Sequence, residues 1–220
     1  NEKTLRDVIY NFRSLDWAEI CSDDFYHAFR TYNSRMRDWI QDLKEGECAF
    51  DNSDPKKRPH KVVDGVIIEN VRKNRDKYTR QRWDRFVQCI HTRNDQLATQ
   101  NTIHPEQDRV YSIRELMEMM TIPRCFKWID LELFELNQLP YEDKKSLYKT
   151  HELNIRRCMG EAVPTEFMRN IAQKIKIGLC KINLGPLEIN KTILDFDLDD
   201  RKSLKNFLKD NPKNLDVTSL

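Results

Sequence analysis

Glycine is scarce in this chain, and its scarcity excludes one class of binding loop. Only five glycines occur among the 220 residues, and the nearest two, Gly178 and Gly185, are seven positions apart. A loop that holds a nucleotide or S-adenosylmethionine needs clustered glycines after a strand, because only there can the backbone approach the ligand closely. The sequence therefore contains no such loop.

Other signatures of catalytic chemistry are also missing. The six cysteines form no C-x-x-C pair, so neither a zinc knuckle nor a dense disulfide framework is predicted, and we expect reduced, intracellular thiols. No Pro-Cys dipeptide marks an activated nucleophile, and no two histidines are close in sequence. No apolar run has the length of a membrane span. We therefore predict no catalytic residue, no metal ligand and no membrane partner, and a cytoplasmic protein.

Positive charge is concentrated in one stretch. Residues 54–93 hold 12 Lys or Arg against five Asp or Glu, a balance of +7, whereas the remaining 26 basic and 31 acidic residues give −5. A basic stretch in an otherwise acidic chain is one signature of a polyanion contact. From charge alone, a solvated basic loop is the favoured interpretation.

The first half of the chain predicts two helices and a hairpin. Thr4 and Asp7 are typical of a helix start, with Thr4 as the cap. Between Ser22 and Gly46, apolar residues spaced three and four apart predict an amphipathic helix of about five turns. Asp64-Gly65 between short apolar runs predicts a hairpin over 62–68, because this dipeptide favours a tight turn. A further strand is predicted over residues 86–92.

The second half is predicted to be helical. Ser112 and Glu115 form the S-x-x-E pattern of a capping box, with Leu116, Met119 and Met120 on the buried side and Pro123 just past the helix end. Another helix follows Pro140, carries Leu147, His151 and Ile155 on one face, and is broken by Gly160 and Pro164. The next has Phe167, Ile171, Ile175 and Leu179 on one face, and a last helix is predicted near residues 199–208.

Several stretches in order resemble the carboxyl-terminal half of the DNA cytosine-5 methyltransferase family. Lys3–Ile9, Tyr78–Asp84 and Cys89–Arg93 resemble parts of the family's target-recognition region. His104–Arg109, with Arg114-Glu115 and Pro123-x-x-Phe126, resembles the ninth motif, and Gly160–Pro164 resembles the tenth. The resemblance covers residues 3–175, while residues 176–220 match no part of the family.

Two positions depart from the family pattern, and one motif occurs in the wrong place. Glu161 stands where the tenth motif normally has Asn, and Cys89 stands where the recognition strand usually begins with Thr. The triplet Glu69-Asn70-Val71 matches the family's catalytic Glu-Asn-Val motif. It lies inside the recognition region rather than before it, so we interpret it as a coincidence.

The resemblance implies a division of labour. The complete enzyme flips a cytosine out of the duplex, attacks it with a Cys thiolate and takes a methyl group from S-adenosylmethionine. The nucleophile and the glycine-rich loop belong to an amino-terminal half, on the same or a separate chain. This chain is then the DNA-reading and cofactor-pocket-completing half, inactive alone, of a bacterial restriction-modification enzyme that acts at the nucleoid. The alternative is a non-catalytic helical interaction or DNA-binding protein derived from the family.

The expected architecture follows the same resemblance. We predict an α+β fold, mostly helical with a small irregular β region like that of a target-recognition domain. Residues 1–107 would form the recognition region, 108–182 the ninth- and tenth-motif helices, and 183–220 a charged extension. Gly160, Glu161 and Ala162 would contact the cofactor. Double-stranded DNA would be contacted by seven residues, namely Arg72, Arg75, Arg80, Arg82, Thr92, Arg93 and Asn94.

Overall fold

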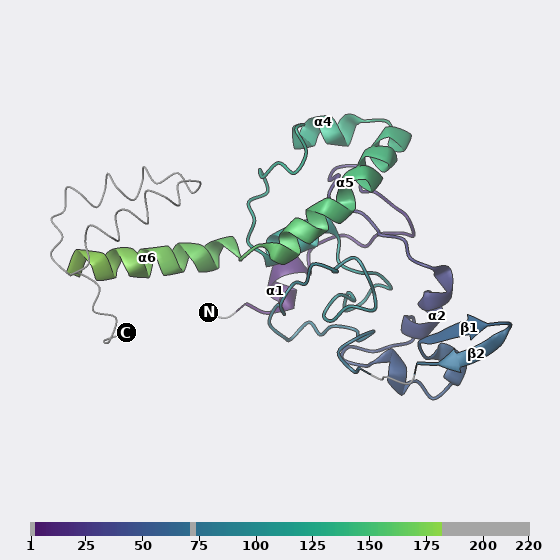
Figure 1. The fold of residues 1–220 in the computed structure, drawn as a ribbon. Helices are drawn as coiled ribbons and strands as arrows, with labels where there is room; N and C mark the ends of the chain where they lie inside the picture. The colour runs from purple at the N-terminus through teal and green to yellow at the C-terminus, as the bar shows by residue number, and fades with distance from the viewer. Residues whose placement is uncertain (1–2, 71–73, 182–220) are drawn as a thin grey trace. The chain divides into compact units, whose positions relative to one another are not determined.

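The computed structural model describes residues 3–70 and 74–181 of the chain (Figure 1). It divides into two compact units, residues 1–165 and 166–220. The helices and strands in chain order are α1 (Leu5–Ile9), η1 (Ser34–Met36), α2 (Arg37–Ile40), η2 (Ala49–Asp51), η3 (Pro55–Lys57), β1 (His60–Val63), β2 (Val66–Glu69), α3 (Ile113–Met119), α4 (Leu133–Gln138), α5 (Tyr141–Glu161) and α6 (Thr165–Lys181). This content is compatible with the predicted α+β class. Within the described ranges, no helix is both long and apolar enough to cross a membrane.

Three predicted local structures are present. Thr4 caps α1, and its backbone N–H donates to Asp7 Oδ2 at 2.8 Å. Ser112 and Glu115 form the predicted capping box at the start of α3. β1 and β2 pair as an antiparallel hairpin in which Val63 lies opposite Val66 and Asp64-Gly65 makes the turn, both with positive φ. Each of these structures depends on residues within a few positions of one another.

The predicted helix between Ser22 and Gly46 is wrong. Only η1 and α2 are helical there, and the rest of the segment is irregular chain. Asp24 makes a tight turn instead, because its carbonyl accepts from the His27 N–H at 2.8 Å and its Oδ1 accepts from the Tyr26 N–H at 3.1 Å. Phe25 is fully buried, and its N–H donates to Asn137 Oδ1 at 2.8 Å. Tertiary partners therefore replace the helical hydrogen bonds that the spacing predicted.

The predicted strand over residues 86–92 is also wrong. A single antiparallel bridge joins Phe86 to Thr4, and the segment otherwise runs as a loop. Its anchor points are buried Ile90 and the α1 backbone, since the Leu5 N–H donates to the Arg85 carbonyl at 2.7 Å. The segment is thus held at both ends without entering a sheet.

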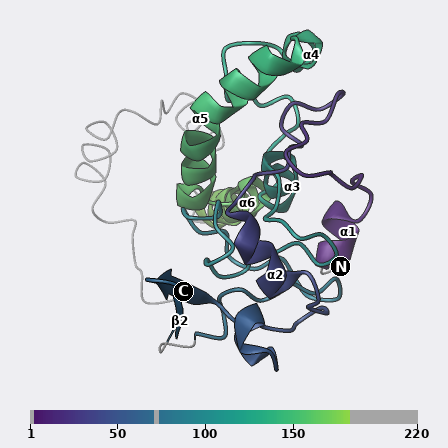
Figure 2. The same cartoon turned by 90° about the vertical axis from the view of Figure 1, so that its right-hand side faces the viewer.

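The first unit has two hydrophobic cores. The larger core joins α1, α3 and α5 through residues such as Leu5, Leu116 and Ile155, and the smaller one gathers around Trp39 and Ile103. Figure 2 shows the irregular chain between α1, α2 and α5, and in both views α4 lies beside the first turns of α5. Because residues on both sides of position 107 share these cores, the segments 1–107 and 108–165 fold together.

The second unit begins at α6, whose helix agrees with the prediction. Its apolar positions Phe167, Ile171 and Ile175 are exposed in the structure. The predicted helix near residues 199–208 lies outside the described residues.

Candidate nucleic-acid interface

Three of the predicted DNA-contacting arginines have side chains at the surface. The Arg75 side chain is 78% exposed, Arg93 65% and Arg82 45%. Each guanidinium lies beside one aspartate, at 3.0 Å from Asp51 for Arg75 and 3.3 Å from Asp95 for Arg93. The Arg75–Asp51 pair is exposed on both sides and contributes little to stability, so Arg75 remains available to another anion. Asp95 is only 8% exposed and also pairs with Arg30 at 3.4 Å, while the Arg93 side chain itself stays at the surface.

Arg82 is held more firmly than the other two. Its Nε and Nη2 donate to the two carboxylate oxygens of Asp84 at 2.9 and 2.7 Å. These hydrogen bonds hold the pKa of Asp84 below its usual range, so the pair is ionised at neutral pH. This bidentate hydrogen bonding fixes the plane of the guanidinium and does not use its Nη1 atom.

Arg80 and Asn94 are buried, which corrects their assignment to the DNA surface. Only 3% of Arg80 and 2% of Asn94 is accessible. The Arg80 guanidinium donates to the carbonyls of Ile40, His104 and Gln107 and to Asp108 Oδ1. A buried guanidinium needs such partners, because an unpaired charge inside a protein is strongly destabilising.

Asn94 connects the predicted recognition region to α5. Its Nδ2 donates to the Arg156 carbonyl at 2.8 Å, and Arg156 Nη1 donates back to Asn94 Oδ1 at 3.2 Å. Arg156 is itself fully buried and reaches Glu152 Oε1 at 2.9 Å and the Tyr111 carbonyl at 2.9 Å. One arginine therefore joins the loop around residue 94, the segment before α3, and α5.

Gly160 allows α5 to lie unusually close to the loop at residues 91–94. A Cβ at this position would lie 2.3 Å from the Thr92 backbone N and 2.5 Å from the His91 carbonyl carbon. The helix can approach this loop only because residue 160 has no side chain. Thr92 itself is exposed, and Arg72 lies outside the described residues.

The residues that resemble the ninth motif form a buried polar scaffold. Arg109 donates to both carboxylate oxygens of Glu115 at 2.7 Å, and the Ser112 N–H donates to Glu115 Oε2 at 2.7 Å. Burial acts to raise the pKa of Glu115, but the charge of Arg109 outweighs it and lowers that pKa to about 2. Burial lowers the pKa of neighbouring His104 to about 3. These groups hold fixed charge states at neutral pH and support structure.

The three predicted cofactor contacts do not form a binding cradle in the described residues. The space beside Gly160 is filled by the backbone of Thr92. Glu161 is exposed, and its Oε1 accepts from Arg157 Nε at 2.9 Å, while Ala162 is exposed at the end of α5. None of the three lines the cleft described next. Their contact with a cofactor stays a prediction.

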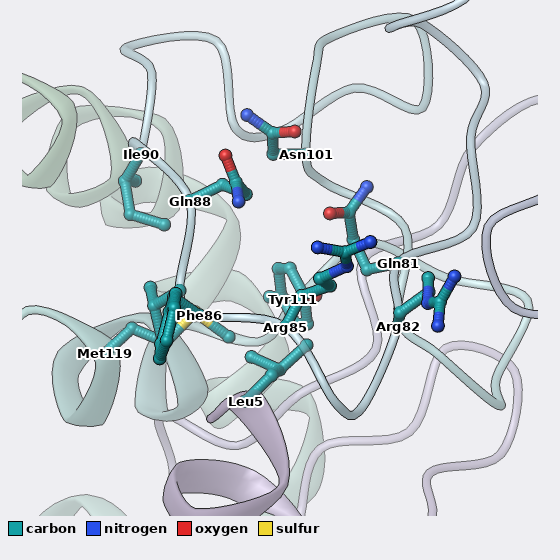
Figure 3. A pocket seen from close by; sticks show the side chains of 11 residues that line it. Leu5, Gln81, Arg82, Arg85, Phe86, Gln88, Ile90, Asn101, Tyr111 and Met119 are labelled. Atoms are coloured by element: carbon teal, nitrogen blue, oxygen red, sulfur yellow. The ribbon is translucent and has the colours of Figure 1, made fainter. Parts of the chain in front are cut away.

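A small cleft with both polar and apolar lining lies beside α1 and α3 (Figure 3). Its empty space of about 260 Å³ includes open solvent, so the cleft is a depression of the surface rather than an enclosed cavity. Its apolar lining includes Leu5, Ile90, Tyr111 and Met119. Its polar and aromatic rim consists of Gln81, Arg82, Arg85, Phe86, Gln88 and Asn101. Of these rim residues, only Arg82 is predicted as a contact from the sequence, because the rim combines separate loop segments.

The described part of the chain contains no recognisable metal-binding site. There, no group of three His, Cys, Asp or Glu residues is arranged to hold a metal ion. The cysteines whose side chains are described, at positions 21, 48, 89, 125 and 158, are free.

Two known proteins are similar to this chain. It is 28% identical over 155 residues to the Type II methyltransferase M1.HgaI of Avibacterium volantium, which covers 68% of this chain and 38% of that protein. It is 27% identical over 180 residues to the Type II methylase M.HgiDII of Herpetosiphon aurantiacus, which covers 80% of this chain and 44% of that protein. The chain thus spans less than half the length of these relatives. No family model and no solved structure matches it. The two likenesses support a relationship to restriction-modification methyltransferases.

Proposed function

We propose that this chain is the DNA-reading, carboxyl-terminal part of a DNA cytosine-5 methyltransferase and that it does not transfer methyl groups alone. The observation that carries the proposal is its similarity to two Type II methyltransferases at 27–28% identity, over less than half of their length. The ordered resemblance to the recognition region and to the ninth and tenth motifs supports the cytosine-5 class. The missing glycine-rich loop supports the need for another part.

Double-stranded DNA is the proposed partner, with Arg75, Arg82 and Arg93 as contacts. Their exposure and their position in or beside the basic stretch support contact with phosphates or base edges. Arginine binds phosphate through charge and two parallel hydrogen bonds, and it binds guanine through the O6 and N7 acceptors. The buried neighbours Arg80 and Asn94 hold the loops from which two of these side chains project.

S-adenosylmethionine is the proposed methyl donor of the complete enzyme. When bound, it would supply an electrophilic methyl group. We assign the described residues of this chain no step in methyl transfer. Their proposed contribution is to present DNA and to support the partner half through the buried scaffold around Glu115 and Arg156.

Reconstitution tests the proposal directly. The chain, the amino-terminal catalytic half and their mixture would each be incubated with duplex DNA and S-adenosylmethionine that carries a labelled methyl group. We expect label in DNA only from the mixture, and 5-methylcytosine after digestion to nucleosides. Methyl transfer by this chain alone would contradict the division of labour. Label recovered as N4-methylcytosine or N6-methyladenine would retain a methyltransferase but overturn the cytosine-5 class.

A helical interaction protein is the second candidate, and exposed apolar positions in α6 favour it. Phe167 is 58% exposed and Ile175 56%. DNA binding measured across salt concentrations separates the two functions, because phosphate contacts release counterions and weaken steeply as salt rises. Absence of DNA binding, with or without the catalytic half, would favour the interaction protein.

A further inference from the structure

The hairpin formed by β1 and β2 leaves most of its apolar surface uncovered. Among its strand residues only His60 is buried, and its ring centroid lies 5.4 Å from that of Trp39. Figure 1 shows the two strands at the margin of the first unit. The apolar side chains of the strands are 40–63% exposed, namely Val62, Val63, Val66, Ile67 and Ile68. A two-stranded hairpin is marginally stable alone in water, and further strands stabilise it.

The outer edge of β2 is open as well. Val63 and Val66 flank the two-residue turn and form a hydrogen-bonded pair, so the next pair, Val62 and Ile67, directs its backbone groups away from the facing strand. The N–H and C=O of Ile67 therefore point outward. Within the described ranges, no backbone group bonds to them. An exposed strand edge of this kind is a template for an added strand.

The β2 edge also lacks the features that usually protect such an edge. Proteins prevent edge pairing with charged side chains, proline or a bulge. Residues 66–68 carry no charge and no proline, and β2 pairs with β1 without a bulge. The acid at the end of the strand, Glu69, accepts from Arg58 Nη1 at 3.3 Å, which offsets its charge. This edge therefore favours the addition of a strand.

The sequence of β2 is complementary to itself. When a second β2 pairs antiparallel with Ile67 opposite Ile67, Val66 lies opposite Ile68 on both sides of the two-fold axis. Each of these cross-strand pairs is apolar, and such pairs stabilise a sheet. A register with Ile68 opposite itself would instead place Ile67 opposite Glu69. A two-fold contact requires a self-complementary surface, and the register centred on Ile67 supplies one.

We propose that two copies of this chain associate through their β2 strands and form a continuous four-stranded antiparallel sheet. The inference goes beyond the proposed function and does not depend on it. The contact consists of one strand edge and a few side chains, well below the roughly 800 Å² per partner of stable complexes. The dimer is therefore weak and reversible, and its population depends on protein concentration.

Sedimentation velocity of the full chain over a range of concentrations tests the proposal. The sedimentation coefficient of the parent should rise with concentration. Ile67→Lys or Ile67→Glu places two like charges opposite each other at the two-fold axis, so either change should abolish the rise. Val62→Lys is the matched control, because it adds a charge on the same face of the hairpin but one strand away from the contact. Urea unfolding followed by tryptophan fluorescence would confirm parental stability in each variant.

A mixture of the two charge variants gives the most specific result. Ile67→Lys and Ile67→Glu should associate with each other although neither associates with itself, because opposite charges then face each other at position 67. A mixture that stays monomeric would overturn the proposed register.

Three other outcomes would overturn the β2 contact itself. They are a parent that stays monomeric at every concentration, self-association that Ile67→Lys leaves unchanged, and an equal loss of self-association in Val62→Lys. A monomeric parent whose DNA binding or reconstitution weakens in Ile67→Lys would assign the hairpin to DNA or to the catalytic half. Each of these results leaves the proposed function to its own test, which is methyl transfer by the reconstituted enzyme.

Discussion

Replacing Gly160 by alanine tests the junction between α5 and the loop at residues 91–94. Two effects oppose each other at this position. Alanine favours a helix interior over glycine by roughly 1 kcal/mol, so a Gly160 without close neighbours would be stabilised by the change. The structure instead puts the new Cβ 2.3 Å from Thr92 N and 2.4 Å from Thr92 Cα. These are backbone atoms, which cannot move aside by changing a rotamer.

The cost of packing an extra Cβ against Thr92 is expected to exceed the gain in helix propensity, so Gly160→Ala should destabilise the protein. Forcing one extra carbon into a packed site costs about 1–3 kcal/mol, and a contact with backbone lies at the upper end of that range. Separation of α5 from the loop also stretches the bonds of 2.8 and 3.2 Å between Asn94 and Arg156. Each buried group that loses its partner costs about 1–3 kcal/mol. After the helix gain is subtracted, we expect a net loss of about 3–5 kcal/mol.

Tryptophan fluorescence during urea and thermal unfolding is the assay, because all four tryptophans lie within residues 1–165. The expected loss corresponds to a fall in Tm of about 6–20 °C for a unit of this size. Gly178→Ala is the matched control. It lies in α6 with nothing within 4 Å of its Cβ, so it should increase helical circular dichroism and leave the tryptophan transition unchanged. A Gly160→Ala variant as stable as the parent would refute the close approach.

Three further results are expected. The free energy of unfolding should fall as the pH drops. The unfolded chain takes up protons at His104 below about pH 6.5 and at Glu115 below about pH 4.5, whereas the folded chain does so only near pH 3 and 2. Urea unfolding should therefore give free energies that are highest above pH 6.5 and decline below it. Arg75→Ala should weaken binding to all duplexes alike and reduce the slope of log affinity against log salt by about 0.9, as measured by fluorescence anisotropy; an unchanged slope would remove Arg75 from the DNA surface. Asp95→Asn should raise DNA affinity and steepen the same slope, because it frees Arg93 and removes a negative charge that repels phosphate. Asp95 also pairs with Arg30 at 3.4 Å, so urea unfolding is measured alongside; weaker binding with unchanged unfolding would show that Asp95 is needed to orient Arg93.

Local signals predicted the elements that depend on local contacts. The caps at Thr4 and Ser112 and the Asp64-Gly65 turn each satisfy backbone groups within four residues, so the sequence alone contains the needed information. The breaks at Gly160 and Pro164 likewise located the end of α5 and the start of α6.

Distant partners decided the parts that the sequence did not predict. The apolar spacing between Ser22 and Gly46 is helical, yet Phe25 is held by Asn137, 112 positions away. Charge was equally ambiguous for the candidate DNA surface. Arg80 and Arg82 are two residues apart in the same basic stretch, but one is 3% accessible and the other lies at the surface. Nothing in their immediate sequence distinguishes a buried guanidinium from an exposed one.

The alternation of buried and exposed arginines has a consequence for DNA reading. Arg82 projects two residues after Arg80, which is fixed to three backbone carbonyls, and Arg93 projects one residue before Asn94, which is fixed to Arg156. A side chain on a loop with such an anchor starts from a narrow set of positions and loses less entropy when it contacts DNA. A solvated basic loop would supply the same charge without this restriction. Under the proposed function, the buried polar groups therefore contribute to specificity, whereas the net charge of the stretch contributes to affinity.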